Sequence, residues 1–183
     1  MIAETLSFLA DLVDAELRQR YGAGSRLVWL AAPGAKINGV DEGAHLSLVN
    51  LEREGVAPNS AQTARRAGDG FALSRQPLNL NLVFMVSINY PDAYAKSLRM
   101  LADVVALFQR TPVMTPQTGD LPKGLARLSV EWRDIDLHAI HSIWTSLGSP
   151  YLPSAIYLAR TLTMDDAGLA GTAPKITSVG LEK

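Results

Sequence analysis

The most regular hydrophobic pattern of the chain lies in residues 78–89, LNLNLVFMVSIN. Successive side chains of a strand point to opposite faces, so this alternation predicts one continuous apolar face. Its members are Leu78, Leu80, Leu82, Phe84, Val86 and Ile88. The opposite face is polar at Asn79 and Asn81 and becomes apolar at Val83 and Met85. Because both faces become apolar toward its end, the segment is predicted to be a strand in the middle of a sheet.

The N-terminal segment repeats apolar residues at the three- and four-residue spacing of one helix face. The positions concerned are Ile2, Leu6, Leu9, Val13 and Leu17. On the remaining surface, Asp14 with Arg18 and Glu16 with Arg20 are spaced for ion pairs along the helix. Gly22 then supplies a stop signal.

Two further helices are predicted later in the chain. One follows residue 89 and has Pro91 in its first turn, where the missing N–H costs nothing. Its expected buried stripe is Tyr94, Leu98, Leu101, Val105 and Phe108. The other helix spans residues 136–147 and presents Leu137, Ile140, Trp144 and Leu147.

Short apolar runs bounded by Gly and Pro predict the remaining strands. These runs are residues 27–31, 45–51, 125–132 and 155–162. In the third run, Leu128, Val130 and Trp132 alternate and are expected on one face. Residues 111–124 are rich in Thr, Pro and Gly and indicate a connection.

Residues 52–76 lack periodicity and predict a long loop, a class of segment that is often functional or mobile. We interpret this loop as a mobile segment or an assembly arm. Arg65, Arg66 and Arg75 are its basic cluster, and Arg53 lies at its start. These arginines are either simply solvated or dock to acidic groups on a neighbour.

The domain prediction is one folded unit over residues 1–164, followed by a tail over residues 165–183. The tail is rich in Gly, Ala and Thr, and residues 175–181, KITSVGL, are a candidate edge strand or assembly arm. Lys175, Ile176 and Val179 are its candidate contact residues.

Composition narrows the function. The length of 183 residues favours one domain over two small ones. With 17 basic and 18 acidic residues, the chain lacks the basic excess of a nucleic-acid binder. The absence of cysteine excludes disulfides, thiolate catalysis and cysteine metal ligands. The hydrophobic fraction of 48% suits a protein that also buries surface against partners.

The N-terminal segment is not expected to target the chain to a membrane. Glu4, Asp11, Asp14 and Glu16 interrupt its apolar residues, and no basic region precedes them. No window holds 18 uncharged apolar residues, so no membrane span is predicted. We therefore expect the chain to be cytoplasmic on synthesis.

The strongest metal-ligand pattern is H-x-x-H, formed by His138 and His141, with Asp134 and Asp136 just upstream. This spacing places both imidazoles on adjacent helix positions, which metal ligation tolerates. A third ligand is not identifiable from the sequence. The alternatives are therefore a small metal- or ligand-binding site and two polar residues on a solvated or interface face.

Other motifs give no catalytic site. PGAK at residues 33–36 does not complete a phosphate-binding loop, and GAG at 22–24 lacks dinucleotide-binding spacing. No G-x-S-x-G elbow exists. The acidic pairs Asp134/Asp136 and Asp165/Asp166 fit helix caps or turns. We predict a protein that is not an enzyme and has no cofactor.

Several segments together resemble one family. They include MIAETLSFLADLVDAELRQRYG, LSLVNLERE, the run LNLNLVFMVSINYPDAYAKSLRMLADVVALFQRTPVMT, and WTSLGSPYLPSAIYLARTL. In this order they are similar to the cap, or tail-terminator, family of contractile injection systems, which are phage-tail-like particles of bacteria. The resemblance covers most of residues 1–164.

The resemblance implies an α/β (α+β) fold with a mixed, mainly antiparallel sheet flanked by helices. It also implies a structural role: a homohexameric ring that terminates the inner tube, contacts the last sheath ring and is incorporated into the particle. The partners would be the chain itself, the tube protein and the sheath protein. The competing functions are the metal- or ligand-binding domain above and a stand-alone adaptor protein.

Overall fold

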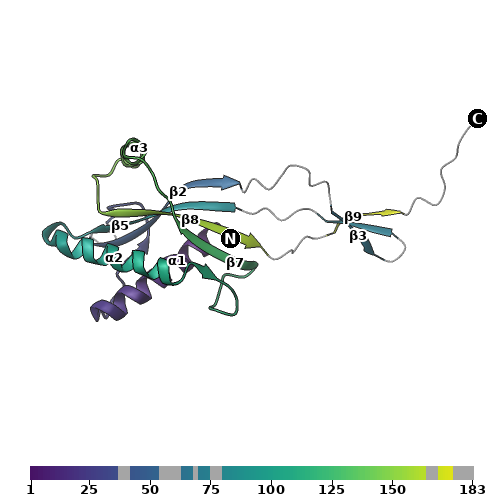
Figure 1. Cartoon of the computed structure of the whole chain (residues 1–183), viewed down its shortest axis with the longest axis horizontal. Coiled ribbons are helices and arrows are strands. Elements are labelled where there is room, and N and C mark those ends of the chain that lie inside the picture. Colours follow the sequence, from purple (N-terminus) through teal and green to yellow (C-terminus); the bar gives the residue numbers. More distant parts are fainter. Residues whose placement is uncertain (37–41, 54–62, 68–69, 75–79, 164–168, 175–183) are drawn as a thin grey trace, which may run out of the picture.

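The structure is a computed structural model that describes residues 1–36, 42–53, 63–67, 70–74, 80–163 and 169–174 (Figure 1). Its helices are α1 (Ile2–Tyr21), the short 3-10 turn η1 (Pro91–Ala93), α2 (Tyr94–Arg110) and α3 (Leu137–Leu147). The strands are β1 (Val28–Leu30), β2 (Gly43–Arg53), β3 (Thr63–Ala67), β4 (Gly70–Ser74), β5 (Leu80–Asn89), β6 (Val113–Met114), β7 (Leu125–Trp132), β8 (Ser154–Thr163) and β9 (Leu169–Pro174).

Six of these strands form the main sheet, in the order β1-β2-β5-β8-β7-β6. β1 runs parallel to β2, and every other neighbouring pair is antiparallel. Strand β5 lies in the interior of the sheet, between β2 and β8, as its two apolar faces predicted. The α+β class with a mixed, mainly antiparallel sheet is confirmed.

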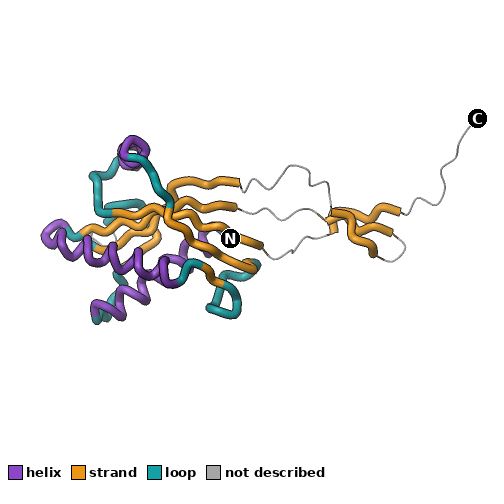
Figure 2. The backbone as a smooth tube through the Cα atoms, in the orientation of Figure 1, coloured by secondary structure: helices purple, strands orange, loops and turns teal. Residues whose placement is uncertain are grey.

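Helices cover both faces of this sheet (Figures 1 and 2). α1 and α2 lie on one face, and α3 lies on the other. The larger hydrophobic cluster joins α1 and α2 to the sheet, and a smaller one gathers beneath α3. Among the described residues, no helix has the length and apolar character that crossing a bilayer requires.

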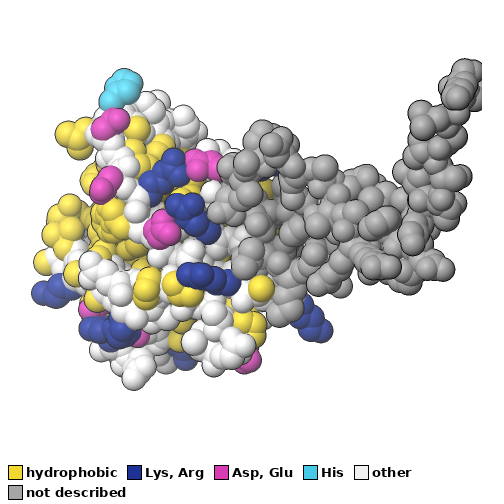
Figure 3. Space-filling view, turned by 45° about the vertical axis from the view of Figure 1, so that its right-hand side comes forward, with side chains coloured by type: hydrophobic (Ala, Val, Ile, Leu, Met, Phe, Trp, Pro, Cys, Tyr) yellow, Lys and Arg dark blue, Asp and Glu magenta, His cyan; other side chains and the backbone are white. Residues whose placement is uncertain are grey.

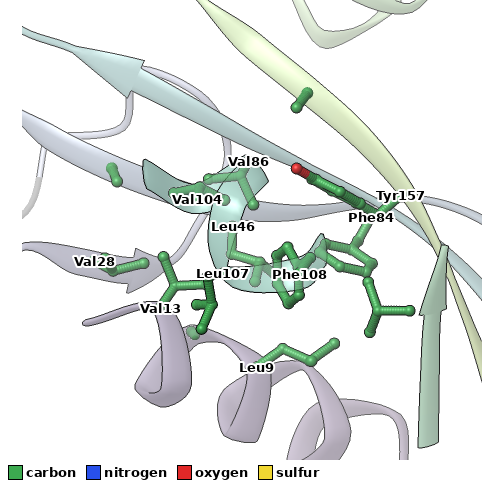
Figure 4. Close-up of a cluster of buried hydrophobic side chains, with 14 of the residues drawn as sticks. Leu9, Val13, Val28, Leu46, Phe84, Val86, Val104, Leu107, Phe108 and Tyr157 are labelled. Carbon is green, nitrogen blue, oxygen red and sulfur yellow. The ribbon is translucent and has the colours of Figure 1, made fainter. Parts of the chain in front are cut away.

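The two clusters use the two faces of β5. Phe84, Val86 and Ile88 belong to the larger cluster, whereas Val83 and Met85 pack in the smaller one. Phe84 stacks on Tyr157 of β8 with ring centroids 5.5 Å apart, and it meets Phe108 of α2 edge-on (Figure 4). Alternating side chains of one strand thus divide between the two helical layers.

α1 buries the stripe that its periodicity predicted, from Leu6 to Leu17, with Ile2 partly buried. The prediction that Asp14 lies on the surface is wrong, because its side chain is buried. Its Oδ1 accepts hydrogen bonds from the backbone N–H groups of Leu27 (2.7 Å) and Val28 (3.0 Å). Asp14 therefore fixes the start of β1 against the helix.

The predicted buried stripe of α2 is also wrong. Tyr94 and Leu98 are 57% and 46% exposed. The buried positions are Ser97, Met100, Val104, Leu107 and Phe108. Two flanks of this helix carry apolar residues, so periodicity alone could not choose between them.

Contacts with α1 explain the orientation of α2. Arg20 of α1 pairs with Asp103 of α2 at 2.9 Å, and Arg110 of α2 pairs with Glu16 of α1 at 2.9 Å. Hydrogen bonds from Arg20 and then Arg110 lower the pKa of Glu16, although partial burial opposes them. These pairs hold the charged flank of α2 toward α1, so the flank with Tyr94 and Leu98 faces away.

Two more residues expected on buried faces are exposed. Leu137, at the first position of α3, is 84% exposed, whereas Trp144 of the same helix is buried. Trp132 ends β7 and is 53% exposed, with its ring edge-on to Tyr157. Both residues lie at the ends of their elements, where neighbouring layers no longer cover them.

The prediction of a loop over residues 52–76 is wrong in three places. β2 continues to Arg53, and this stretch also contains the antiparallel strands β3 and β4. β4 pairs with β9 on its other side, giving a second sheet in the order β3-β4-β9 (Figure 2). The short strand β6, within the expected connection 111–124, was also not predicted.

Candidate assembly surfaces

The second sheet joins two segments that are distant in sequence. β3 and β4 come from the insertion between β2 and β5, and β9 comes from the segment after β8. In the main sheet, Arg53 pairs with Leu80 and Asn81 pairs with Arg160. The end of β2, the start of β5 and the final part of β8 therefore lie at the same end of that sheet. All three connections to the second sheet leave the main sheet from this end.

The candidate contact residues divide between these segments. Arg53 is exposed at the end of β2. Arg65 and Arg66 lie in β3, an edge strand of the second sheet, where they pair in register with Ala72 and Phe71 of β4. Arg75, Lys175, Ile176 and Val179 lie outside the described residues. The structure thus brings Arg65 and Arg66 into one sheet with the segment that precedes Lys175.

The histidine pair lies on the exposed side of α3. His138 and His141 are both exposed, and the two acids upstream already have structural partners. Asp134 accepts a hydrogen bond from the Trp132 indole at 2.8 Å, and Asp136 caps α3 by accepting from the Ala139 N–H at 2.8 Å. Within the described ranges, no group of three or more His, Asp or Glu residues could hold a metal ion.

An apolar groove lies at the β1–β2 border of the main sheet. It has a volume of about 490 Å³. Its walls include Ile2, Leu6, Leu30, Ala32, Leu48 and Leu147. β1 pairs with β2 only from Ala44 to Leu46, and no described strand covers β2 beyond that point on this side. We call this feature the β1–β2 groove.

A second apolar surface lies near the β8–β7 side of the sheet. Trp132 and Tyr151 line a small pocket of about 110 Å³ together with Ile140 of α3. Tyr151 is 63% exposed, and Leu137 precedes Ile140 by one helical turn. We call Trp132, Leu137 and Tyr151 the Trp132 patch. Figure 3 shows hydrophobic and acidic side chains interspersed at the end of the molecule that carries α3.

Sequence reasoning did not identify either surface. The groove combines α1, the end of β1, β2 and the end of α3, so no single run of residues shows it. The Trp132 patch consists of apolar residues in regular patterns, which periodicity assigns to the core. The unexplained exposure of large apolar side chains is visible only once the layers are in place.

Tyrosines with shifted pKa values have structural surroundings. Burial, followed by the hydrogen bond that its hydroxyl donates to Asp103, raises the pKa of Tyr21 to about 12. Burial in the core raises the pKa of Tyr157. Tyr21 links α1 to α2, and Tyr157 packs between Phe84 and Phe108. These shifts therefore arise from helix packing and core packing.

Two solved structures are similar to this chain. One is titled as the PVC sheath/tube terminator of an extracellular contractile injection system in the extended state, with a TM-score of 0.57 and 15% identity over 94% of this chain. The other is titled as the cap of the anti-feeding prophage, an AFP tube-terminating cap, with a TM-score of 0.54 and 13% identity over 94%. This chain spans 61% and 59% of their lengths.

At these identities, the two structures establish a shared fold. A search of curated proteins gives no significant match. The family model described as "Pvc16 N-terminal domain" matches residues 4–178, which includes the main sheet and all three strands of the second sheet. The chain therefore belongs to the Pvc16 N-terminal domain family.

Proposed function

We propose that this chain is the cap of a contractile injection particle, where it terminates the inner tube and contacts the last sheath ring. The observation that carries the proposal is the family match over residues 4–178. The fold shared with a sheath/tube terminator and a tube-terminating cap supports it. The near-neutral charge and the exposed apolar surfaces also suit a protein that assembles with other proteins.

The cap acts as a homohexameric ring. A ring of identical subunits uses two different patches on each subunit, and it closes when the rotation between neighbours is correct. The second sheet supplies one assembly element, since both of its segments leave the same end of the main sheet. Arg53, Arg65, Arg66, Arg75, Lys175, Ile176 and Val179 are its proposed contact residues toward neighbouring subunits, tube or sheath.

The direct test is growth of the inner tube with and without this chain. We expect tube protein of the same particle to form long tubes of variable length on its own. With the chain added, tubes should be shorter and carry a ring at one end, because a bound cap blocks further addition. Electron microscopy measures both properties. Tubes of unchanged length without end-bound rings would contradict the cap function.

The second sheet gives a prediction about assembly. Deletion of residues 55–75 removes β3 and β4, and deletion of residues 166–183 removes β9. Both deletions are expected to leave the main sheet folded and to abolish the hexamer. The two variants should behave alike because β4 and β9 pair in one sheet. Native mass spectrometry measures the assembly state, and far-UV circular dichroism measures the fold.

A point variant provides the control for these deletions. Gln109→Ala changes an exposed position near the end of α2, away from the second sheet in sequence, and should keep the assembly state of the unmodified chain. An intact hexamer in both deletion variants would refute the assembly role of the second sheet. That result would leave the cap proposal to the tube-growth test.

A further inference from the structure

The β1–β2 groove and the Trp132 patch lie toward opposite borders of the main sheet. The groove is at the β1–β2 border, and the patch adjoins β8 and β7 on the other side of β5. α3 connects the two sites, since Ile140 lines the pocket in the patch and Leu147 lines the groove. Two unlike surfaces that face different directions meet the geometric requirement of a ring interface between identical subunits.

The groove is suited to receive apolar side chains from outside the subunit. Leu30, at the end of β1, is exposed, and Leu48 is only partly buried. The open border of β2 beyond Leu46 also leaves the edge of the sheet uncovered among the described residues. Proteins usually cover such an edge, because an exposed apolar strand promotes unwanted pairing.

The patch supplies side chains of the complementary kind. Trp132 and Tyr151 project large rings, and Leu137 is the most exposed of the large hydrophobic residues described. Tryptophan and tyrosine are enriched among the residues that dominate binding energy at protein interfaces. Trp132 is held in place by its hydrogen bond to Asp134 and by its edge-on contact with Tyr157, which limits the entropy lost on binding.

Charges beside the two surfaces are opposite in sign. Asp134 and Asp136 flank the patch, and Lys36 follows the Ala32–Pro33 wall of the groove by three residues. None of these three side chains forms an ion pair within the described residues. Opposite charges at the rim steer association and set the orientation of the partners.

We propose that the Trp132 patch of one copy of this chain docks into the β1–β2 groove of the next copy. Trp132 and Tyr151 fill the groove between α1 and the end of β1, and the two aspartates lie toward Lys36. The occupant of the groove is thus a second copy of the chain. The inference rests on the proposed ring and identifies the surfaces that form it.

The absence of cysteine makes a direct test possible. Ala32→Cys places a thiol in the groove wall, and Tyr151→Cys places one in the patch. We expect a short bismaleimide reagent to link the double variant of the full chain into a ladder of covalent oligomers. Each single variant alone should give no ladder. An equal mixture of the two single variants should give cross-linked dimers and nothing larger, because each subunit then carries only one half of the contact.

The control pairs Ala32→Cys with Gln109→Cys on exposed α2, which should give no ladder. A ladder with the first pair and none with the control supports the interface. The absence of a ladder with the first pair overturns it, whether or not native mass spectrometry detects rings. The tube-growth test on the same preparations separates the two proposals, because capped tubes without cross-links would reject the interface and keep the cap function.

Trp132→Ala tests the energetic contribution of the patch. We expect it to weaken association between copies by about tenfold or more, as measured by concentration-dependent native mass spectrometry. Trp132→Phe should restore most of the association, since it keeps an aromatic ring against Tyr157. Equal association of the alanine variant and the unmodified chain, both folded by circular dichroism, would overturn the role of Trp132.

Discussion

Replacement of Phe84 by Ala is expected to lower the free energy of unfolding by about 3–5 kcal/mol. The side chain is fully buried, stacks on Tyr157 and meets Phe108 of α2. Truncation removes this contact area and leaves a cavity between β5, β8 and α2 that the surrounding strands can close only in part. Urea unfolding followed by circular dichroism measures the change, with an unchanged denaturant slope as the check for two-state behaviour.

The matched control is Tyr94→Ala, which also truncates an aromatic residue. Tyr94 is 57% exposed at the start of α2, so its loss is expected to cost about 0.5 kcal/mol or less. The pair of variants also tests the orientation of α2, because the hydrophobic periodicity places Tyr94 in the buried stripe. A loss for Tyr94→Ala as large as that for Phe84→Ala would contradict the packing described here.

Replacement of Asp14 by Ala is expected to lower the free energy of unfolding by about 3 kcal/mol. The buried carboxylate accepts two backbone hydrogen bonds, from Leu27 and Val28, and Arg18 lies 3.7 Å away. Removing it leaves two donors without their acceptor at the start of β1. Asp14→Asn keeps an acceptor oxygen without the charge, so its loss should be intermediate. Chemical denaturation at neutral pH measures all three proteins.

Asp11→Ala provides the control for Asp14. Asp11 lies on the same helix and pairs with Arg26, but its side chain is exposed to solvent. Exposed ion pairs contribute little, so we expect a change of about 0.5 kcal/mol or less. Similar losses for the two aspartates would show that the hydrogen bonds to β1 do not stabilise the fold in the way we infer.

The prediction for Asp14 also bears on the β1–β2 groove. Asp14 holds the start of β1, and Leu30 at the end of the same three-residue strand lines the groove. Loss of this anchor should therefore weaken association between copies as well as the fold itself. The scaffold of helices and sheet thus supports the proposed assembly surfaces, which lie at its borders.

The amino-acid sequence alone determined most of the main sheet and its helices. The alternation in residues 78–89 placed β5 in the interior, and the apolar stripe of α1 faces the core as expected. Asp136 caps α3, in agreement with the reading of the acidic pairs as caps or turns. Local periodicity and capping carry such information because they depend on residues within one or two turns of each other.

Only the tertiary structure decided which of two apolar flanks of α2 is buried and why Asp14 is inside. It also decided that β4 pairs with β9, whose segments are separated by the whole of β5 to β8. Each outcome depends on contacts between residues far apart in the chain, such as Arg20 with Asp103 or Asp14 with Val28. A periodic pattern shows that an element has an apolar face, but its neighbours in the fold determine where that face lies.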